Sequence, residues 1–273
     1  MKQARVCFIV ASPMTARAFL SGHIAALSGR YAIDLAVDVG DETELGSIPA
    51  RARIVPLPIR RKVAPLADLT ALSRLFLLFR RERYAAVSSV TPKAGMLALL
   101  AATLARVPLR IHIFTGQVWT TRLGWKRWLL KTVDRFMARL ATHVLADSPS
   151  QRDFMVKEGI VSADKIRVLG EGSICGADGE RFRPDAGRRV GIRRSHGIPE
   201  TAVVFLFVGR LNRDKGVLDL AEAFAALENQ AAWLLVVGPD EANLSGEMEL
   251  RLGAALGRTR FVGYTDRPED FMA

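Results

Sequence analysis

Short apolar runs alternate with amphipathic stretches along most of the chain. The runs are rich in β-branched residues and predict strands buried on both faces, as in a parallel sheet. The first series of strands is expected at residues 6–10, 33–37, 54–57, 86–90, 109–114, 144–146 and 166–169. The helices between them are expected at residues 16–27, 66–81, 93–105, 125–140 and 149–158. This alternation predicts an α/β fold with a doubly wound parallel sheet.

A second series of the same kind begins near Arg188. It predicts strands and helices at residues 203–208, 217–228, 233–237, 247–256 and 260–263. The stretch 176–199 is rich in glycine, arginine and proline without clear periodicity, which predicts an interdomain linker. We therefore expect two Rossmann-like domains, residues 1–187 including the linker and residues 188–273. Three parallel strands with an open edge are few for a domain, so the second one is expected to be incomplete.

The amino-acid composition says little about the fold, but it limits the classes of binding partner. The 273 residues are 49% hydrophobic and 25% charged, as in ordinary globular proteins. The net charge of +11 favours polyanionic partners such as nucleic acid, an anionic membrane face or phosphorylated substrates. Cys7 and Cys175 lack metal-binding or redox spacing, so free thiols in a reducing compartment are expected. No signal peptide or membrane-spanning segment is evident, which predicts a cytoplasmic chain that can touch a membrane.

The clearest candidate site is the turn that follows the strand at residues 203–208 and begins the next helix. It runs from Gly209 to Gly216, and its glycines let the backbone approach a ligand closely. A helix start offers unpaired N–H groups and the positive end of the helix dipole to an anion. Its cations are Arg210, Arg213 and Lys215. We interpret this turn as a diphosphate-binding loop, with a solvated surface turn as the alternative.

Polar side chains also follow strands of the first series, at the edge where open α/β sheets bind ligands. Ser12 and Thr15 follow the first strand and either face a ligand or cap the helix. Lys93 begins a helix, which is electrostatically unfavourable unless an anion lies there too. It therefore indicates a phosphate site, with an exposed lysine as the alternative.

The loop after the strand at residues 109–114 offers groups for a sugar. Thr115 and Gln117 can bind sugar hydroxyls, and Trp119 can stack on a sugar face. His112 lies inside the strand, which favours a hydrogen-bonded core histidine. Glu171, after a later strand, is either a carboxylate of the cleft or a solvated side chain.

The helix at residues 125–140 has an unusual charge pattern. At about 100° per residue, its basic side chains share roughly one third of the circumference, with Trp128 among them. These side chains are Arg127, Lys131, Arg135 and Arg139. The apolar side, predicted to be core, consists of Leu129, Leu130, Val133, Phe136, Met137 and Leu140. The basic face with its tryptophan predicts a surface for an anionic membrane, with a plain solvated face as the alternative.

Several function classes are disfavoured because their motifs are missing. The first crossover loop lacks G-x-G-x-x-G, which argues against a dinucleotide dehydrogenase. There is no Walker A loop, no G-x-S-x-G and no paired Cys/His spacing for zinc. No nucleic-acid recognition module is visible either. We therefore do not expect a zinc site or a dinucleotide cofactor, and we do not expect a nucleic-acid partner, although the net charge alone leaves one open.

Val208-Gly209-Arg210-Leu211 with Asp214-Lys215-Gly216 resembles the donor-diphosphate loop of the family-four retaining glycosyltransferases, which have the GT-B fold. Residues 91–95, 146–150 and 169–182 resemble the subgroup that builds capsule, O-antigen or exopolysaccharide units. The chain is also similar to the bacillosamine-linked N-acetylgalactosaminyltransferases. The resemblance covers nearly the whole chain.

The resemblance implies retaining transfer of a hexose or N-acetylhexosamine from a UDP-sugar, with no metal or other cofactor. The implied acceptor is a polyprenyl-diphosphate-linked sugar at the anionic inner membrane face, in surface polysaccharide biosynthesis. Arg210 and Lys215 would be the catalytic pair that grips the diphosphate and neutralises the leaving group. Other implied donor-binding residues are Gly209, Val262, Gly263, Ser12 and Thr15. The candidate acceptor-binding residues are Lys93, Thr115, Gln117 and Glu171.

Two departures from the family pattern leave alternatives open. The family often has a histidine or arginine before the glycine matched to Gly116, where this chain has Thr115, so no catalytic histidine is assigned. The family's E-x-x-x-x-x-x-x-E motif and its returning helix belong beyond Ala273. One alternative is therefore a non-catalytic, truncated, membrane-associated protein that binds a nucleotide or lipid diphosphate. Another is a GT-B sugar-nucleotide epimerase, which the basic tryptophan-containing helix disfavours.

Overall fold

The computed structural model describes residues 3–39, 52–59 and 64–273. The chain divides into two compact units, Met1–Gly176 and Ala177–Ala273. Each unit has hydrophobic clusters of its own.

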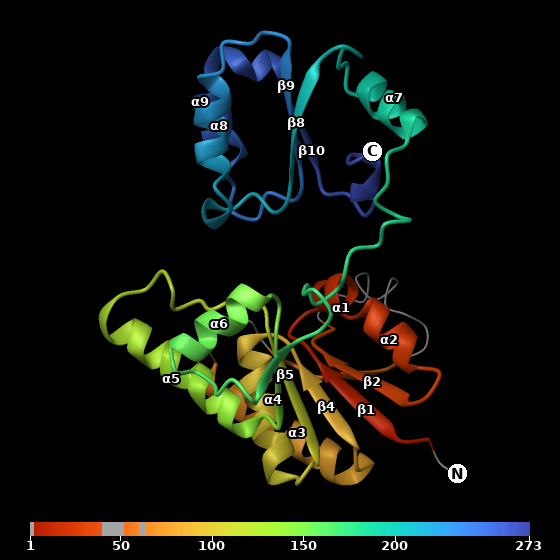
Figure 1. Cartoon of the computed structure of the whole chain (residues 1–273), viewed down its shortest axis with the longest axis vertical. Helices are drawn as coiled ribbons and strands as arrows, with labels where there is room; N and C mark the ends of the chain where they lie inside the picture. Colours follow the sequence, from red (N-terminus) through yellow and green to blue (C-terminus); the bar gives the residue numbers. More distant parts are fainter. Residues whose placement is uncertain (1–2, 40–51, 60–63) are drawn as a thin grey trace. The chain divides into compact units, whose positions relative to one another are not determined.

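The described part of the first unit contains a seven-stranded parallel sheet in the order β3-β2-β1-β4-β5-β6-β7 (Figure 1). Its strands are β1 (Arg5–Ile9), β2 (Ala32–Val37), β3 (Ala52–Pro56), β4 (Ala86–Ser89), β5 (Leu109–Phe114), β6 (His143–Ala146) and β7 (Ile166–Val168). The chain proceeds outward from β1 to β3, then returns to β4 on the other side of β1. This reversal makes the sheet doubly wound, as the alternation of strands and helices predicts.

The helices of this unit are α1 (Pro13–Phe19), α2 (Ser21–Leu27), α3 (Pro65–Glu82), α4 (Pro92–Leu104), α5 (Gly124–Leu140) and α6 (Pro149–Lys157). The single helix predicted at residues 16–27 is wrong, because α1 and α2 are separated at Leu20. The Ser21 hydroxyl donates to the Arg17 carbonyl at 2.8 Å.

The two faces of β1 enter different core clusters. Cys7 and Ile9 pack with side chains of α3 and α4, whereas Val6, Phe8 and Val10 pack with those of α1 and α2. All of these side chains are buried. A strand covered on both faces explains the continuous apolar runs in the sequence.

A buried carboxylate joins the first three strands near their amino ends. Asp34 on β2 accepts hydrogen bonds from Arg53 on β3 at 2.6 and 3.0 Å and from Arg5 on β1 at 3.2 Å. The Tyr84 hydroxyl donates to the same carboxylate, and Glu82 pairs with both arginines. Burial opposes ionisation of Asp34, but the bonds from Arg53 and Tyr84 outweigh it and the pKa is lowered.

The described part of the second unit contains a three-stranded parallel sheet in the order β10-β9-β8 (Figure 1). Its strands are β8 (Val203–Val208), β9 (Ala232–Val237) and β10 (Thr259–Gly263). Its helices are α7 (Ala186–Ser195), α8 (Val217–Ala225) and α9 (Ser245–Leu252), with 3-10 helices η2 (Arg213–Lys215), η3 (Gly253–Arg258) and η4 (Pro268–Asp270). β8 is an edge strand of this sheet, and its predicted burial on both faces is wrong because the face that carries Val203 and Phe205 is partly exposed. Val203 and Phe205 are 54% and 45% exposed.

The stretch predicted to be a linker contains a helix. α7 is capped by the Asp185 side chain, which accepts from the Arg188 N–H at 3.0 Å. Arg193 is buried and donates to the carbonyls of Pro199, Glu200 and Ala202. The helix contains many arginines and few apolar residues, so hydrophobic periodicity did not reveal it.

Candidate functional site

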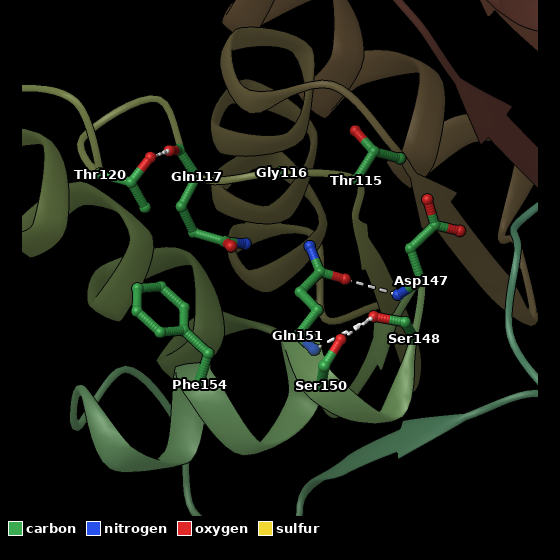
Figure 2. Close-up of a pocket in the computed structure, with 9 residues that line it drawn as sticks. All are labelled: Thr115, Gly116, Gln117, Thr120, Asp147, Ser148, Ser150, Gln151 and Phe154. Atoms are coloured by element: carbon green, nitrogen blue, oxygen red, sulfur yellow. Dashed lines mark hydrogen bonds between the residues drawn. The ribbon is translucent and has the colours of Figure 1, made fainter.

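A polar pocket of about 550 Å³ lies at the carboxyl ends of β5 and β6 (Figure 2). This is the edge at which open α/β sheets bind ligands. Figure 2 shows the amide side chains of Gln117 and Gln151 pointing into the space between the loop after β5 and the start of α6 (Pro149–Lys157). The pocket is lined by Thr115, Gly116, Gln117, Thr120, Asp147, Ser148, Ser150, Gln151 and Phe154.

One wall of the pocket is ordered by the start of α6. Ser148 is the N-cap, and its hydroxyl accepts from the Gln151 N–H at 3.1 Å. The side-chain Oε1 of Gln151 accepts from the Asp147 N–H at 2.6 Å, and the Ser150 and Ser148 hydroxyls are 3.0 Å apart. Pro149 occupies the first helical turn, where its missing N–H has no partner to lose. Local capping chemistry therefore orients the polar side chains of this wall.

The chemistry of the lining suits a neutral polyol. The lining consists of hydroxyl, amide and aromatic groups with the Asp147 carboxylate, and it includes no lysine or arginine. Hydroxyls, amides and carboxylates can donate to or accept from sugar hydroxyls, whereas phosphate is usually held by cationic side chains. The structure thus brings Thr115 and Gln117 together as the sequence predicts, and adds Asp147, Ser150 and Gln151.

Trp119 was expected to stack on a sugar, and this prediction is wrong. Its side chain is fully buried, and its Nε1–H donates to Asp134 at 2.7 Å. It stacks on Phe154 with ring centroids 5.5 Å apart. Burial raises the pKa of Asp134 to about 6. A tryptophan in a loop can fill the core when a buried carboxylate accepts from its indole.

Lys93 lies at a helix start, where a lysine requires a nearby anion, and this anion is the carboxylate of Asp68 rather than a bound phosphate. Its Nζ lies 2.6 Å from Oδ1 of Asp68 on α3. Neither Lys93 nor the exposed Glu171 is among the residues that line the polar pocket. The structure therefore does not gather the predicted acceptor-binding residues in one place.

Ser12 and His112 have structural roles. Ser12 is the N-cap of α1, where its hydroxyl accepts from the Thr15 N–H at 3.3 Å, as one of the two alternatives predicts. The two hydroxyls of Ser12 and Thr15 lie 3.0 Å apart. His112 is buried, with Nδ1 2.8 Å from the Ser89 hydroxyl. Burial lowers the pKa of His112 to about 4, so the prediction of a core histidine is confirmed.

The predicted phosphate loop lies at the carboxyl end of β8, in the second unit. Gly216 has a φ of +69° and precedes α8, a left-handed conformation that favours glycine. The Gly209 N–H donates to the Val237 carbonyl at 2.9 Å, which ties the ends of β8 and β9. A Cβ atom on Gly238 would lie 1.8 Å from the Gly209 carbonyl oxygen. Gly238 is a required residue of this site that the sequence interpretation missed, although it directly follows a strand.

The cations of this loop differ in their partners. Arg210 is paired with Glu241 at 2.9 Å, and Arg213 is paired with Glu247. Lys215 is exposed and forms no ion pair with a described residue. Lys215 is therefore ready for an anion, whereas Arg210 must first exchange its carboxylate partner.

Val262 and Gly263 end the neighbouring strand β10. Gly263 has a φ of +79°, and the pairing register with β9 shifts between Phe261 and Gly263. The Gly263 carbonyl accepts from the Gly238 N–H at 2.8 Å. The ends of β8, β9 and β10 thus form one glycine-containing edge where backbone can approach a ligand.

The basic face of α5 is not an open surface. Arg127 and Lys131 bind Glu158 at 3.2 and 2.6 Å, and both cations lie over the ring of Trp119. Arg135 donates to the carbonyls of Glu158 and Gly159. These three side chains therefore hold the C-terminal end of α6, and their predicted role as a membrane surface stays a prediction. Arg139 remains exposed.

The outer face of α5 is instead apolar. Trp125 and Trp128 are 69% and 66% exposed, and Leu129 and Phe136 are 45% and 42% exposed. Leu129 and Phe136 were predicted to be core, which is wrong. The side of the helix that is buried carries Asp134, Met137 and Ala138. The pairing of the basic residues with α6 leaves this aromatic face outward.

No helix in residues 3–39, 52–59 and 64–273 is long and apolar enough to cross a membrane. The same residues contain no group of histidine, cysteine, aspartate and glutamate side chains suited to hold a metal ion. Cys7 and Cys175 are free thiols, one buried and one exposed.

Comparison with known proteins assigns both units. The glycosyl transferase 4-like domain matches residues 16–172, and the glycosyl transferases group 1 family matches residues 189–272. The capsular polysaccharide biosynthesis glycosyltransferase CapM of Staphylococcus aureus is 31% identical over 191 residues, which are 69% of this chain and 50% of CapM. The UDP-Gal:alpha-D-GlcNAc-diphosphoundecaprenol alpha-1,3-galactosyltransferase of Escherichia coli is 29% identical over 174 residues, 63% of this chain and 44% of that protein. The chain spans about half the length of these relatives.

Solved structures agree on the fold. HepE of Anabaena in complex with UDP and glucose has a TM-score of 0.76 at 17% identity, covering 99% of this chain and 72% of HepE. A UDP-N-acetylglucosamine 2-epimerase has a TM-score of 0.64 at 16% identity, covering 100% of this chain and 71% of the epimerase. Fold similarity alone does not separate transferase from epimerase, whereas the sequence matches do. The chain belongs to the family-four glycosyltransferases, which have the GT-B fold.

Proposed function

We propose that the chain acts in retaining transfer of a hexose or N-acetylhexosamine from a UDP-sugar to a polyprenyl-diphosphate-linked acceptor, in surface polysaccharide biosynthesis. The name of the Escherichia coli relative includes both a UDP-sugar and a diphosphoundecaprenol acceptor. CapM is named for capsular polysaccharide biosynthesis, and the HepE structure contains UDP and glucose. These relatives support the substrate classes, which we carry over to this chain as a proposal.

The observation that carries the donor side is the loop from Gly209 to Gly216. Gly216 directly precedes α8, whose first backbone N–H groups have no acceptor within the helix, and Lys215 is exposed beside them. In the proposed reaction, Lys215 and Arg210 stabilise the negative charge that develops on the departing UDP. In this proposal, the two cationic side chains stabilise the departing UDP without a metal ion. Val262 and Gly263 are assigned to the nucleobase.

The polar pocket is assigned to the acceptor sugar. Its hydroxyl, amide and carboxylate groups match sugar hydroxyls, and its lining has no cation for a diphosphate. Thr115, Gln117 and Asp147 are the side chains that we assign to this contact. The acceptor diphosphate is therefore expected to bind outside this pocket.

The lipid tail of such an acceptor requires a membrane nearby, and we assign the outer face of α5 to that contact. Exposed tryptophans favour the interface between lipid head groups and acyl chains, and basic residues favour anionic lipids. The interface between head groups and acyl chains would be contacted by Trp125, Trp128 and Phe136. Arg122, Lys126 and Arg139 are exposed basic residues on or beside the same helix. The proposed location is the cytoplasmic face of the inner membrane, as a peripheral protein.

The donor assignment is tested by UDP binding. Arg210→Ala and Lys215→Ala should each weaken UDP about tenfold or more, since a hydrogen bond to a charged group contributes about 1.5–3 kcal/mol. Arg194→Ala removes an exposed arginine from α7 and serves as the control. Unchanged affinity in both loop variants, measured by isothermal titration calorimetry, would exclude this loop as the donor site.

Transfer itself is tested with a UDP-sugar and a polyprenyl-diphosphate-linked sugar, by following the anomeric configuration of the product. Product with the donor's configuration supports the proposal. UDP binding with no product under these conditions would instead favour the non-catalytic binding protein.

A further inference from the structure

A second pocket, of about 480 Å³, lies at the amino ends of β4 and β5, where α3 and α4 end. Its floor is apolar and includes the buried Phe79, Tyr84 and Val107. Three arginines, Arg80, Arg83 and Arg106, also line it. We propose that this pocket binds a phosphate-bearing ligand through these three arginines.

The pocket is separate from the polar pocket proposed for the acceptor. Pro108 of the arginine pocket directly precedes β5, and Thr115 of the polar pocket directly follows it. A six-residue strand spans about 20 Å at 3.3 Å per residue. The two pockets therefore lie at opposite edges of the sheet, and the arginine pocket does not depend on the proposed transfer reaction.

The three arginines of the pocket have no acidic partner among the described side chains. Arg80, Arg83 and Arg106 are exposed, and none forms an ion pair with a described residue. The neighbouring carboxylate of Glu82 is engaged by Arg5 and Arg53 at 2.8 and 3.2 Å. Like charges around one pocket repel each other, and a bound anion would relieve that repulsion.

The backbone at two of the arginines is also unusual. Arg83 and Arg106 have φ angles of +51° and +59°, in the left-handed region that bulky residues rarely adopt. Each stands at the end of a different helix, a position usually filled by glycine. A cation favours a helix C-terminus, so these arginines also interact with the negative ends of α3 and α4; at α3 this role is shared by Arg81, which lies outside the pocket. Two arginines in strained positions around one pocket indicate a need for their guanidinium groups.

The chemistry of the pocket identifies the class of ligand. Guanidinium groups present paired N–H donors that match two phosphate oxygens at once. The floor offers Phe79 and Val107 to an apolar part of the same ligand. The Tyr84 hydroxyl is already used by Asp34, so the arginines supply the polar recognition. A free phosphate compound and the head group of an anionic phospholipid share this chemistry.

The test uses the full chain carrying Arg210→Ala and Lys215→Ala, so that the donor loop does not contribute anion binding. Pyrophosphate is titrated calorimetrically, and hydrogen exchange is followed at residues 79–84 and 104–108. In this parent, Arg80→Gln and the pair Arg83→Gly/Arg106→Gly should each weaken pyrophosphate binding at least tenfold. Arg81→Gln, which removes a neighbouring exposed arginine outside the pocket, should leave binding unchanged.

The glycine variants should remain folded, because glycine adopts a positive φ without strain. Their melting temperature should be equal to that of the parent or higher, so a loss of binding can be assigned to the missing guanidinium groups. A parallel series measures co-sedimentation with phosphatidylglycerol vesicles. Loss of pyrophosphate binding identifies a free phosphate compound as the ligand, and loss of vesicle binding alone identifies a lipid head group. If the variants match the parent in both series, the arginines only neutralise the helix ends and the proposal is wrong.

Discussion

Single residues decide what can be buried in the first unit. His112 lies within β5, and a Cβ atom on Gly95 would be 2.4 Å from its Cε1 atom. The backbone of α4 can therefore pass over the imidazole only because residue 95 is glycine. The Ser89 hydroxyl on the neighbouring strand is the hydrogen-bond partner of the buried Nδ1 atom, at 2.8 Å.

We expect His112 to make the chain sensitive to acid. Its pKa is about 4 in the folded state and about 6.5 when unfolded, so the unfolded state binds more protons between these values. Stability should therefore fall by roughly 3 kcal/mol as the pH drops from about 6.5 to 4. His112→Asn cannot titrate and should flatten this part of the pH dependence in urea unfolding.

Asp134 contributes with the opposite sign, since its pKa is raised to about 6 and its protonation favours folding. The readout is therefore the difference between the slopes of the wild type and His112→Asn. Parallel curves across this range would mean that His112 does not control the acid response.

At the scale of the element, α5 shows how packing decides which face of a helix is buried and which is exposed. The basic face is bound to Glu158 and Gly159 of the adjacent segment, while Asp134 and Met137 enter the core. What remains for solvent is the face with Trp125, Trp128 and Phe136. An aromatic face is poorly suited to water alone, which is the physical reason for assigning it to a membrane.

Replacing Trp125, Trp128 and Phe136 together by alanine should weaken binding to anionic vesicles at least tenfold, because their apolar area is what enters the interface. The melting temperature should change little, since all three side chains are exposed. Co-sedimentation measures the binding, and Leu250→Ala is a control at an exposed leucine of the second unit. Vesicle binding equal to wild type would place the membrane surface elsewhere.

Neutralising Lys131, Arg135 and Arg139 together should affect stability, unlike the replacement of the aromatic side chains. Two of these residues hold the end of α6, so the variant should lose stability as well as charge. Exposed pairs contribute only about 0–1 kcal/mol each, so the loss should be modest. Circular dichroism melting curves measure it alongside vesicle binding.

At the scale of the whole molecule, each unit has its own core. The clusters around β1–β7 contain no residue of the second unit, and those around β8–β10 contain none of the first. A change buried in one core should therefore leave the protection of the other unit largely unchanged.

Asp34→Asn tests this independence. It leaves Arg5 and Arg53 without their buried carboxylate, but Glu82 still pairs with both arginines and both are partly exposed. We expect a loss of roughly 1–3 kcal/mol, below that for a fully buried pair. Hydrogen exchange should quicken in β1–β3 and stay unchanged in β8–β10. Asp153→Asn, at an exposed ion pair, is the control, and equal effects on both units would contradict separate cores.

Most of the architecture was predictable from sequence because strands and helices reflect local periodicity. β5 and β8 have the predicted bounds, and the turn from Gly209 to Gly216 follows the predicted strand end. Helix α7 was missed because Arg193, its buried member, is satisfied by carbonyl groups rather than by apolar contacts. The break at Leu20 was missed because the apolar positions Leu20, Ile24 and Leu27 keep a helical spacing across it.

Local order along the chain was enough to establish the α/β fold, the glycine-rich turn from Gly209 to Gly216 and the polar residues after β5. Each of these depends on neighbours a few residues apart. The tertiary structure alone showed that Lys93 pairs with Asp68, that Arg210 pairs with Glu241 and that Trp119 is buried on Asp134. It also showed which face of α5 is exposed. These outcomes depend on groups that folding brings together from distant parts of the chain. Which charged side chains are paired and which aromatic side chains are buried therefore follows only from the tertiary structure.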